Sequence, residues 1–224
     1  MFRFRQFSVR HDRCGMKVGT DGVLLGAWAG VDGAGTALDI GTGTGLIALM
    51  LAQRNAAVRV LGIDIDGDAV VQARENVAES PWPDRIDIRQ ADFCQDSLQG
   101  MQFDLIVSNP PFFQEDTACP DFRRDQARHS SSLPMPILIQ RAAGLLSEEG
   151  CLCLIVPATA HAEVIGEAAA NRLYLCRRTD IKTTPRKPPR RTLLEFSRRM
   201  VGCEHSVLTL NSEAYQVLTG EFYL

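Results

Sequence analysis

The chain has 224 residues, of which 45% are hydrophobic and 23% are charged, and its formal net charge is −3. This length suits one α/β domain with a short addition rather than two full domains, and the composition is that of an ordinary globular protein. The negative net charge argues against indiscriminate nucleic-acid binding, and no apolar run approaches the roughly 20 residues that span a membrane or forms a signal-peptide core, so we expect a cytoplasmic location.

Residues 1–30 are predicted to form an extension in front of the main domain. Short strands are indicated where phenylalanines and other apolar residues alternate with polar ones, at Phe2, Phe4 and 7–9. A glycine-containing loop at 17–22 follows. The apolar run 23–29 then starts a short helix, for which Thr20 or Asp21 is the expected N-cap.

Residues 31–224 alternate between strand-like and helix-like segments, which is typical of a parallel sheet. The strand-like segments are 37–40, 58–63, 86–89, 103–107, 151–156, 173–177, 191–196 and 206–210. The helix-like segments are 46–52, 66–79, 137–146, 159–170 and 212–220, the last capped by Ser212. No long helix separates the final two strands. We therefore predict an α/β, Rossmann-like fold whose seven-stranded, mostly parallel sheet has an antiparallel C-terminal strand.

A glycine loop joins the first of these strands to its helix. Gly41, Gly43 and Gly45 allow a sharp turn and a close approach of the backbone to a ligand. A dinucleotide-binding loop starting at Gly41 needs a glycine where this chain has Leu46, and the Asp39 carboxylate would repel a pyrophosphate. S-adenosylmethionine carries an ammonium and a sulfonium but no phosphate, so it suits this loop better.

Acidic residues also follow the next two strands. Asp64 ends the second strand, where a carboxylate accepts hydrogen bonds from both ribose hydroxyls. Asp92 and Phe93 follow the third strand, where they suit an adenine amino group and an adenine ring. Either acid alone is most simply a turn residue. Acids after three successive strands, all beside one glycine loop, predict a binding site for S-adenosylmethionine.

The sequence Asn109-Pro110-Pro111-Phe112 follows the fourth strand, at the edge where open α/β sheets bind ligands. The amino nitrogen of adenine or of a carboxamide is a poor nucleophile, so catalysis needs acceptors that hold its N–H groups. The Asn109 side chain and the Pro110 carbonyl are the expected acceptors, both prolines rigidify the turn, and Phe112 stacks on a planar substrate. The pattern alone leaves adenine and glutamine amide open.

Metal chemistry is not indicated. The four histidines are isolated, the seven cysteines include no Cys-x-x-Cys pair, and an odd cysteine count without a framework favours a reducing compartment. Basic residues cluster locally instead, after the Asn-Pro-Pro-Phe segment and in the late proline-rich stretch. The candidates for contact with RNA phosphates are Arg123, Arg124, Arg128, Lys187 and Arg190.

The motifs together resemble the Asn-Pro-Pro-aromatic amino-methyltransferases, which share the Rossmann-like class I methyltransferase fold. Four segments, 11–28, 80–82, 125–128 and 212–224, are similar to the bacterial valine-tRNA adenine-N6 methyltransferases, which modify the adenosine 3′ of the anticodon. The resemblance runs nearly end to end. It implies that Asn109, Pro110 and Phe112 receive the base and that Lys17, Thr20 and Asp21 close over the donor pocket. It departs at Phe112, where that family usually has tyrosine.

Alternatives remain at this point. A glutamine-N5 protein methyltransferase needs the same corner, but that class typically has a helical N-terminal domain for which residues 1–30 leave no room. A guanine-N2 RNA methyltransferase shares the motif. A non-catalytic donor- or RNA-binding module is disfavoured by intact Asn109 and Pro110, and a nicotinamide oxidoreductase by Asp39 and Leu46. The sequence leaves open whether the protein is a monomer or a homodimer.

Overall fold

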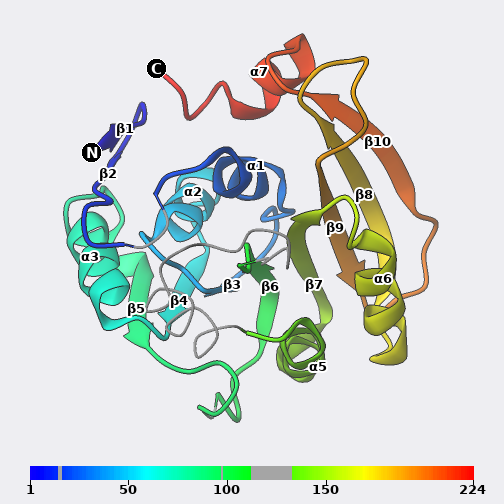
Figure 1. The fold of residues 1–224 in the computed structure, drawn as a ribbon. Helices are drawn as coiled ribbons and strands as arrows, with labels where there is room; N and C mark the ends of the chain where they lie inside the picture. The colour runs from blue at the N-terminus through cyan, green and yellow to red at the C-terminus, as the bar shows by residue number, and fades with distance from the viewer. Residues whose placement is uncertain (15–16, 97, 112–132) are drawn as a thin grey trace, which may run out of the picture.

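A mixed eight-stranded sheet forms the centre of the computed structural model, which describes residues 1–14, 17–96, 98–111 and 133–224 (Figure 1). Its strands are β3 (Thr36–Ile40), β4 (Arg59–Asp64), β5 (Ile86–Gln90), β6 (Phe103–Ser108), β7 (Leu146–Pro157), β8 (Tyr174–Lys182), β9 (Arg191–Ser197) and β10 (Glu204–Thr209). Their order across the sheet is β10-β8-β9-β7-β6-β3-β4-β5. Neighbouring strands pair in parallel except where β9 runs antiparallel to both β7 and β8.

The predicted α/β fold class is confirmed, and so is an antiparallel strand near the C-terminus. The predicted count of seven strands was wrong, because all eight strand-like segments enter the sheet. β8 and β9 form a hairpin, which reverses β9. The chain then returns along the outer side of β8, so β10 pairs with it in parallel from Glu204 to Thr209. The final strand is therefore parallel to its neighbour, and the antiparallel strand lies inside the sheet.

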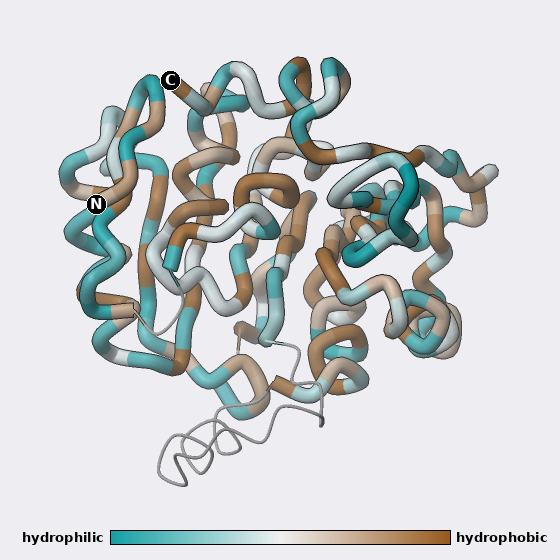
Figure 2. Tube along the Cα trace, turned by 45° about the horizontal axis from the view of Figure 1, so that its top comes forward, coloured by the Kyte–Doolittle hydropathy of each residue, from teal (hydrophilic) through white to brown (hydrophobic). Residues whose placement is uncertain are grey.

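Helices cover both faces of the sheet. They are α1 (Thr20–Trp28), α2 (Leu46–Arg54), α3 (Gly67–Ala78), α5 (Met135–Leu145), α6 (His161–Ala170) and α7 (Glu213–Thr219), with a 3-10 turn η1 (Pro83–Arg85) before β5. Residues of α1, α2 and α3 share one buried apolar cluster with one face of the strands, and residues of α5 and α6 share a second cluster with the other face. Figure 2 shows hydrophobic segments both in the strands and in parts of the helices that cover them.

The two ends of the chain lie side by side (Figure 1). The predicted short N-terminal strands are β1 (Phe2–Arg3) and β2 (Ser8–Val9), and the structure shows that they pair antiparallel. The Arg5 amide donates to the Phe222 carbonyl at 2.9 Å, and the Phe4 and Tyr223 rings stack with centroids 6.0 Å apart. The C-terminal helix is capped by Ser212 as predicted, through a hydrogen bond from the Tyr215 amide.

The predicted N-cap of α1 was wrong. The cap residue is Gly19, neither Thr20 nor Asp21 caps the helix through its side chain, and the helix begins at Thr20. The Asp21 carboxylate instead accepts a hydrogen bond from Arg191 Nε at 2.7 Å. This carboxylate therefore binds a side chain that is distant in sequence and does not bind the backbone amides at the start of its own helix. In the part of the chain that the structure describes, no helix is long and apolar enough to cross a membrane.

Candidate active site

A cleft of about 1700 Å³ lies at the carboxyl ends of the parallel strands. Most of the residues predicted from the sequence line it: Lys17, Thr20, Asp21, Gly41, Gly43, Asp64, Asp92, Phe93, Asn109, Pro110 and Pro111. Asp39 and Gly45 lie behind this lining, and Lys187 and Arg190 lie outside it. Four other predicted residues, Phe112, Arg123, Arg124 and Arg128, fall outside the described residues. The fold therefore brings most of the residues predicted to bind the methyl donor, together with the Asn-Pro-Pro corner, to one cavity.

The glycine loop makes one wall of the cleft. Gly41, Gly43 and Gly45 have φ values of +71°, +55° and +79°, a region that side chains of L-residues rarely adopt. A Cβ added at Gly41 would meet nothing within 4 Å, so this part of the loop faces open space. A Cβ at Gly45 would instead lie 3.4 Å from Ala73 of α3. Gly41 and Gly43 thus shape the cavity, whereas Gly45 permits close helix packing.

Asp39 is fully buried beneath this loop. Its Oδ2 accepts a hydrogen bond from the Thr42 hydroxyl at 2.7 Å, and Oδ1 has no hydrogen-bond partner among the described residues. Burial raises the pKa of the carboxyl group from 3.8 to about 7, although the Thr42 hydrogen bond opposes that rise. A cationic ligand group near the loop would stabilise the ionised form of this carboxyl group.

We expect the stability of Asp39→Asn, relative to that of the wild-type protein, to increase as the pH rises. The pKa in the folded state exceeds the unfolded value, so between about pH 4 and 7 the folded state binds more protons and wild-type stability falls with rising pH. Asparagine does not titrate. The difference in Tm, Asp39→Asn minus wild type, should increase by several degrees, on the order of 5 °C, between pH 4.5 and pH 8. Calorimetry at both pH values checks this, and a constant difference would contradict it.

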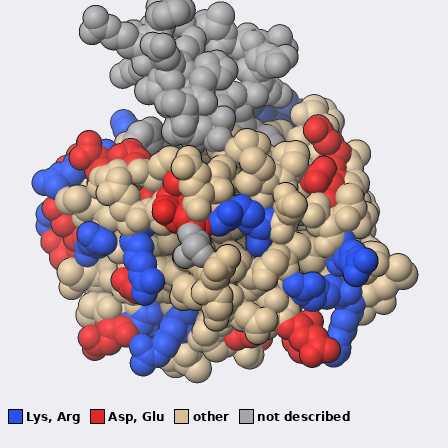
Figure 3. Space-filling view, turned by 90° about the horizontal axis from the view of Figure 1, so that it is seen from below, with Lys and Arg blue, Asp and Glu red and all other residues tan. Residues whose placement is uncertain are grey.

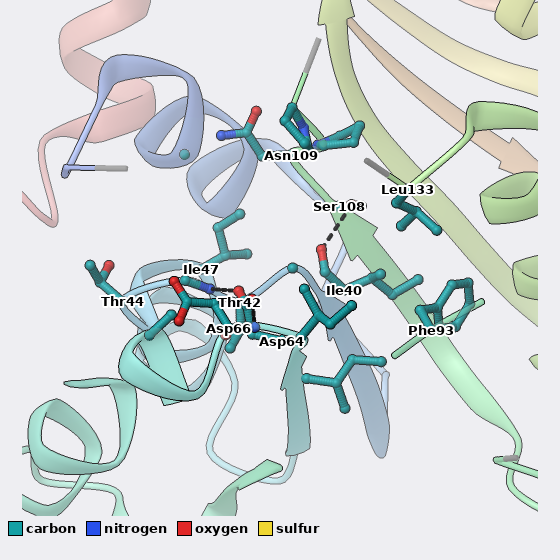
Figure 4. Close-up of a pocket in the computed structure, with 18 of the residues that line it drawn as sticks. Ile40, Thr42, Thr44, Ile47, Asp64, Asp66, Phe93, Ser108, Asn109 and Leu133 are labelled. Atoms are coloured by element: carbon teal, nitrogen blue, oxygen red, sulfur yellow. Dashed lines mark hydrogen bonds between the residues drawn. The ribbon is translucent and has the colours of Figure 1, made fainter. Parts of the chain in front are cut away.

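The end of β4 holds the loop in place. Asp64 Oδ2 accepts from the Gly43 amide at 2.8 Å, and Oδ1 accepts from the Asp66 amide at 3.0 Å. Partial burial raises the pKa of Asp64, while these two amide hydrogen bonds lower it. Asp66 caps α3 through the Asp68 amide and also lines the cleft. Figure 4 shows Asp64 and Asp66 on the same wall, beside Thr42 and Thr44.

The loop after β5 adds an apolar wall. Phe93 is buried at 5% exposure and lines the cleft, and the Asp92 carboxylate accepts from the Cys94 amide at 2.8 Å. Arg141 of α5 holds this loop from behind, because its guanidinium donates to the Cys94 carbonyl at 3.1 Å and lies 5.4 Å from the Phe93 ring centroid. Arg141 was not predicted from the sequence, since its partners are distant in the chain.

The Asn-Pro-Pro corner lies beyond the end of β6, across the cleft from the β4 wall (Figure 4). Ser108 is fully buried, and its hydroxyl donates to the Ile40 carbonyl at 2.8 Å. Ile40 and Ser108 are also paired residues of β3 and β6. These contacts join the corner to the strand that carries the glycine loop, and they leave Asn109 half-buried at the cavity.

Asn76 connects the N-terminal extension to the glycine loop and was not predicted. This α3 side chain is 1% exposed. Its Oδ1 accepts from the Arg10 amide at 2.8 Å, and its Nδ2 donates to the carbonyls of Arg10 and Thr44, both at 2.9 Å. Both amide protons and the amide oxygen are therefore used to fix residue 10 against the loop.

The charges of the cleft fit a cationic nucleoside. From the strand ends β4 and β5, the described lining contributes the acids Asp64, Asp66 and Asp92 and no lysine or arginine. Such a wall favours a ligand with a positive charge and a ribose and disfavours a pyrophosphate. No group of three or more potential metal ligands occurs among the residues with described positions.

The amino-acid sequence is similar to those of known methyltransferases. Residues 23–179 match the family model described as the methyltransferase small domain. The chain is 49% identical to the tRNA1(Val) (adenine(37)-N6)-methyltransferase of Phocaeicola vulgatus, covering 100% of this chain and 97% of that protein. It is 45% identical to the protein of the same name from Klebsiella pneumoniae, covering 100% of this chain and 94% of the relative.

Solved structures show a similar fold. A predicted O-methyltransferase from Agrobacterium tumefaciens superposes with a TM-score of 0.68 at 20% identity, covering 90% of this chain and 96% of that one. A TehB-like S-adenosylmethionine-dependent methyltransferase from Corynebacterium glutamicum gives a TM-score of 0.55 at 20% identity, covering 83% of this chain and 90% of that one. At this identity the likeness concerns the fold alone.

Proposed function

The chain belongs to the tRNA1(Val) (adenine(37)-N6)-methyltransferase family, and on that premise we propose that it methylates N6 of adenosine 37, just 3′ of the anticodon, in a valine tRNA. The observation that carries this proposal is the end-to-end match to relatives of that name at 43–49% identity. The methyl donor is S-adenosylmethionine, whose sulfonium supplies the electrophilic methyl group when it is bound.

The donor site is assigned to the glycine loop and the three acids around it. The Asp64 carboxylate, already fixed by the Gly43 and Asp66 amides, has the remaining acceptor capacity that two ribose hydroxyls require. Asp92 and Phe93 receive the adenine, through an acceptor oxygen and an apolar ring face. Asp39 stabilises the cationic methionine end electrostatically from beneath Thr42.

The target amino group binds at the Asn-Pro-Pro corner. The Asn109 side-chain oxygen and the Pro110 carbonyl accept its two N–H groups, which favours the pyramidal nitrogen of the transition state. Pro110 and Pro111 restrict the backbone here, so the acceptors are oriented before the base arrives. A general base is not required, because the nitrogen becomes acidic only after it has formed its new bond. Phe112 is assigned the stacking position.

The N-terminal extension is proposed to cover the donor. Lys17, Thr20 and Asp21 line the cleft, and Asn76 fixes the preceding residue 10. Lys187 and Arg190 are exposed in the loop between β8 and β9, where they are proposed to contact tRNA phosphates together with Arg123, Arg124 and Arg128. We propose a cytoplasmic location for the enzyme, in keeping with a tRNA substrate.

A labelling experiment tests the function. Purified protein is incubated with radiolabelled S-adenosylmethionine and, separately, with total tRNA and total protein from a strain that lacks the enzyme. We expect label in tRNA, released as N6-methyladenosine on nucleoside analysis and concentrated in a valine tRNA. Label only in protein would support the glutamine-N5 alternative, label in guanosine would support the guanine-N2 alternative, and label in neither fraction would support a binding module.

A further inference from the structure

The cleft is lined by acids on one side and by an arginine–aspartate ion pair on the other. Along the carboxyl edge of the sheet, the acids Asp64 and Asp92 follow β4 and β5, Asn109 follows β6, and Arg191 stands beside the end of β7 because it pairs with Pro157. The strand order therefore places Asn109 between an acidic side, suited to the cationic donor, and a side that carries an arginine.

Arg191 is held in a defined orientation. Its Nε donates to Asp21 Oδ2 at 2.7 Å, and its Nη1 donates to the Arg190 carbonyl at 3.2 Å. Nη2 has no hydrogen bond to any residue within the described ranges. The Arg191 side chain is 38% exposed and lines the cleft. The Nε donor and one Nη1 donor are thus used by the protein, and the Nη2 donors remain available to a ligand.

We propose that Arg191, oriented by Asp21, binds a phosphate group of the target nucleotide and thereby positions its base at Asn109. This inference rests on the proposed function, and it gives Asp21 a second role besides covering the donor. A guanidinium presents paired donors that match phosphate oxygens, and it is charged at every relevant pH. Arg191 lies on the side of Asn109 away from the acidic donor side, so it is placed to meet a phosphate of a nucleotide whose base lies at Asn109.

A stabilising ion pair is not a sufficient explanation of this arrangement. Both side chains are about one-third exposed, at 38% for Arg191 and 33% for Asp21, and ion pairs with such exposure contribute little to stability. A general basic field is also absent on the described part of the face in Figure 3, where lysine and arginine side chains are interspersed with acidic ones. The ion pair is therefore better explained by a need to orient the Arg191 guanidinium.

The variant Arg191→Gln tests the proposal by steady-state methylation of tRNA and by direct tRNA and donor binding. We expect KM and Kd for tRNA to rise about tenfold near 0.15 M salt, and the slope of log K against log salt to weaken by about 0.9, as for the loss of one phosphate contact. The Kd for S-adenosylmethionine should stay within about twofold. Arg191→Lys keeps the positive charge but loses the paired donors of the planar guanidinium. It should show an intermediate tRNA affinity and an unchanged slope of log K against log salt.

Two further variants sharpen the result. Asp21→Asn keeps the Arg191 charge but weakens its orientation, so tRNA affinity should fall about threefold without a change in salt slope. Arg59→Gln is the matched control, because Arg59 is exposed at the start of β4, on the opposite edge of the sheet. It should leave tRNA affinity unchanged.

The contrary outcomes are distinct. If Arg191→Gln raises the donor Kd while tRNA affinity is kept, Arg191 belongs to the donor site and the proposal is wrong. The proposal also fails if Arg191→Gln lowers only Tm. If the unaltered protein methylates no tRNA, the proposed function fails separately, and the direct tRNA-binding comparison still decides the role of Arg191.

Discussion

Replacing Asn109 with alanine is expected to lower kcat for tRNA methylation by about 100- to 1000-fold, the range found when one preorganised polar group is removed from a reacting centre. The Asn109 side chain is half-buried at the cleft, beyond the end of β6. Its oxygen is assigned to an N–H of the target amino group, a contact that strengthens only as the nitrogen becomes pyramidal. The loss should therefore appear in kcat rather than in ground-state binding.

Donor affinity separates this role from a structural one. The Kd of S-adenosylmethionine for Asn109→Ala, measured by calorimetry, should stay within about twofold of wild type, because the glycine loop and Asp64 are untouched. Asn171→Ala is the matched control, since it removes the same amide at the end of α6, where it contacts Glu167. It should keep full activity. A parallel loss of donor binding and transfer in Asn109→Ala would mean that Asn109 belongs to the donor site.

Replacing Asp64 with alanine is expected to weaken donor binding by about 100-fold or more. Charge-assisted hydrogen bonds to a carboxylate contribute roughly 1.5–3 kcal/mol each, and about 1.4 kcal/mol corresponds to a tenfold change in Kd. The variant loses the proposed ribose contacts, and it also leaves the Gly43 and Asp66 amides without their acceptor. Both effects act on the same donor pocket.

Asp64→Asn distinguishes these two effects. Its amide oxygen can still accept from the Gly43 amide at the position of Oδ2, but it offers one acceptor where the carboxylate offers two. We expect donor affinity to fall about tenfold and Tm to change less than in Asp64→Ala. Asp87→Ala serves as a control, because Asp87 is an exposed β5 residue paired with Arg89. Undiminished donor affinity in Asp64→Ala would refute the assignment of Asp64 to the ribose.

Much of the fold was predictable because its causes are local. The alternation of short apolar strands with amphipathic helices indicated a parallel sheet, and β3, β4, β5 and β6 end within about two residues of the predicted positions. The order of strands in the C-terminal half was harder to predict from the sequence. The direction of β10 depends on which side of the β8–β9 hairpin the returning chain takes, and the residues of β10 itself do not encode that choice.

The convergence of the candidate donor-site residues on one cleft was predictable for a related reason. In a parallel sheet the carboxyl ends of neighbouring strands meet at one edge, so polar residues that follow successive strands converge without any knowledge of their contacts. The cleft does contain Asp64, Asp92 and Asn109 together. The prediction could not say that Asp39 lies behind the loop, because a strand residue faces the cleft or the core according to the local packing.

The sequence by itself determined the fold class, the family resemblance, the glycine conformations of the loop at 41–45 and the placement of the acids at strand ends. Each follows from short-range backbone preferences or from the periodicity of apolar residues. The tertiary structure alone decided the partners of Asn76 and Asp21, which lie 66 residues away at Arg10 and 170 residues away at Arg191. A buried amide or carboxylate takes the partners that the packed chain places within 3 Å, and sequence separation carries no information about which residues those are.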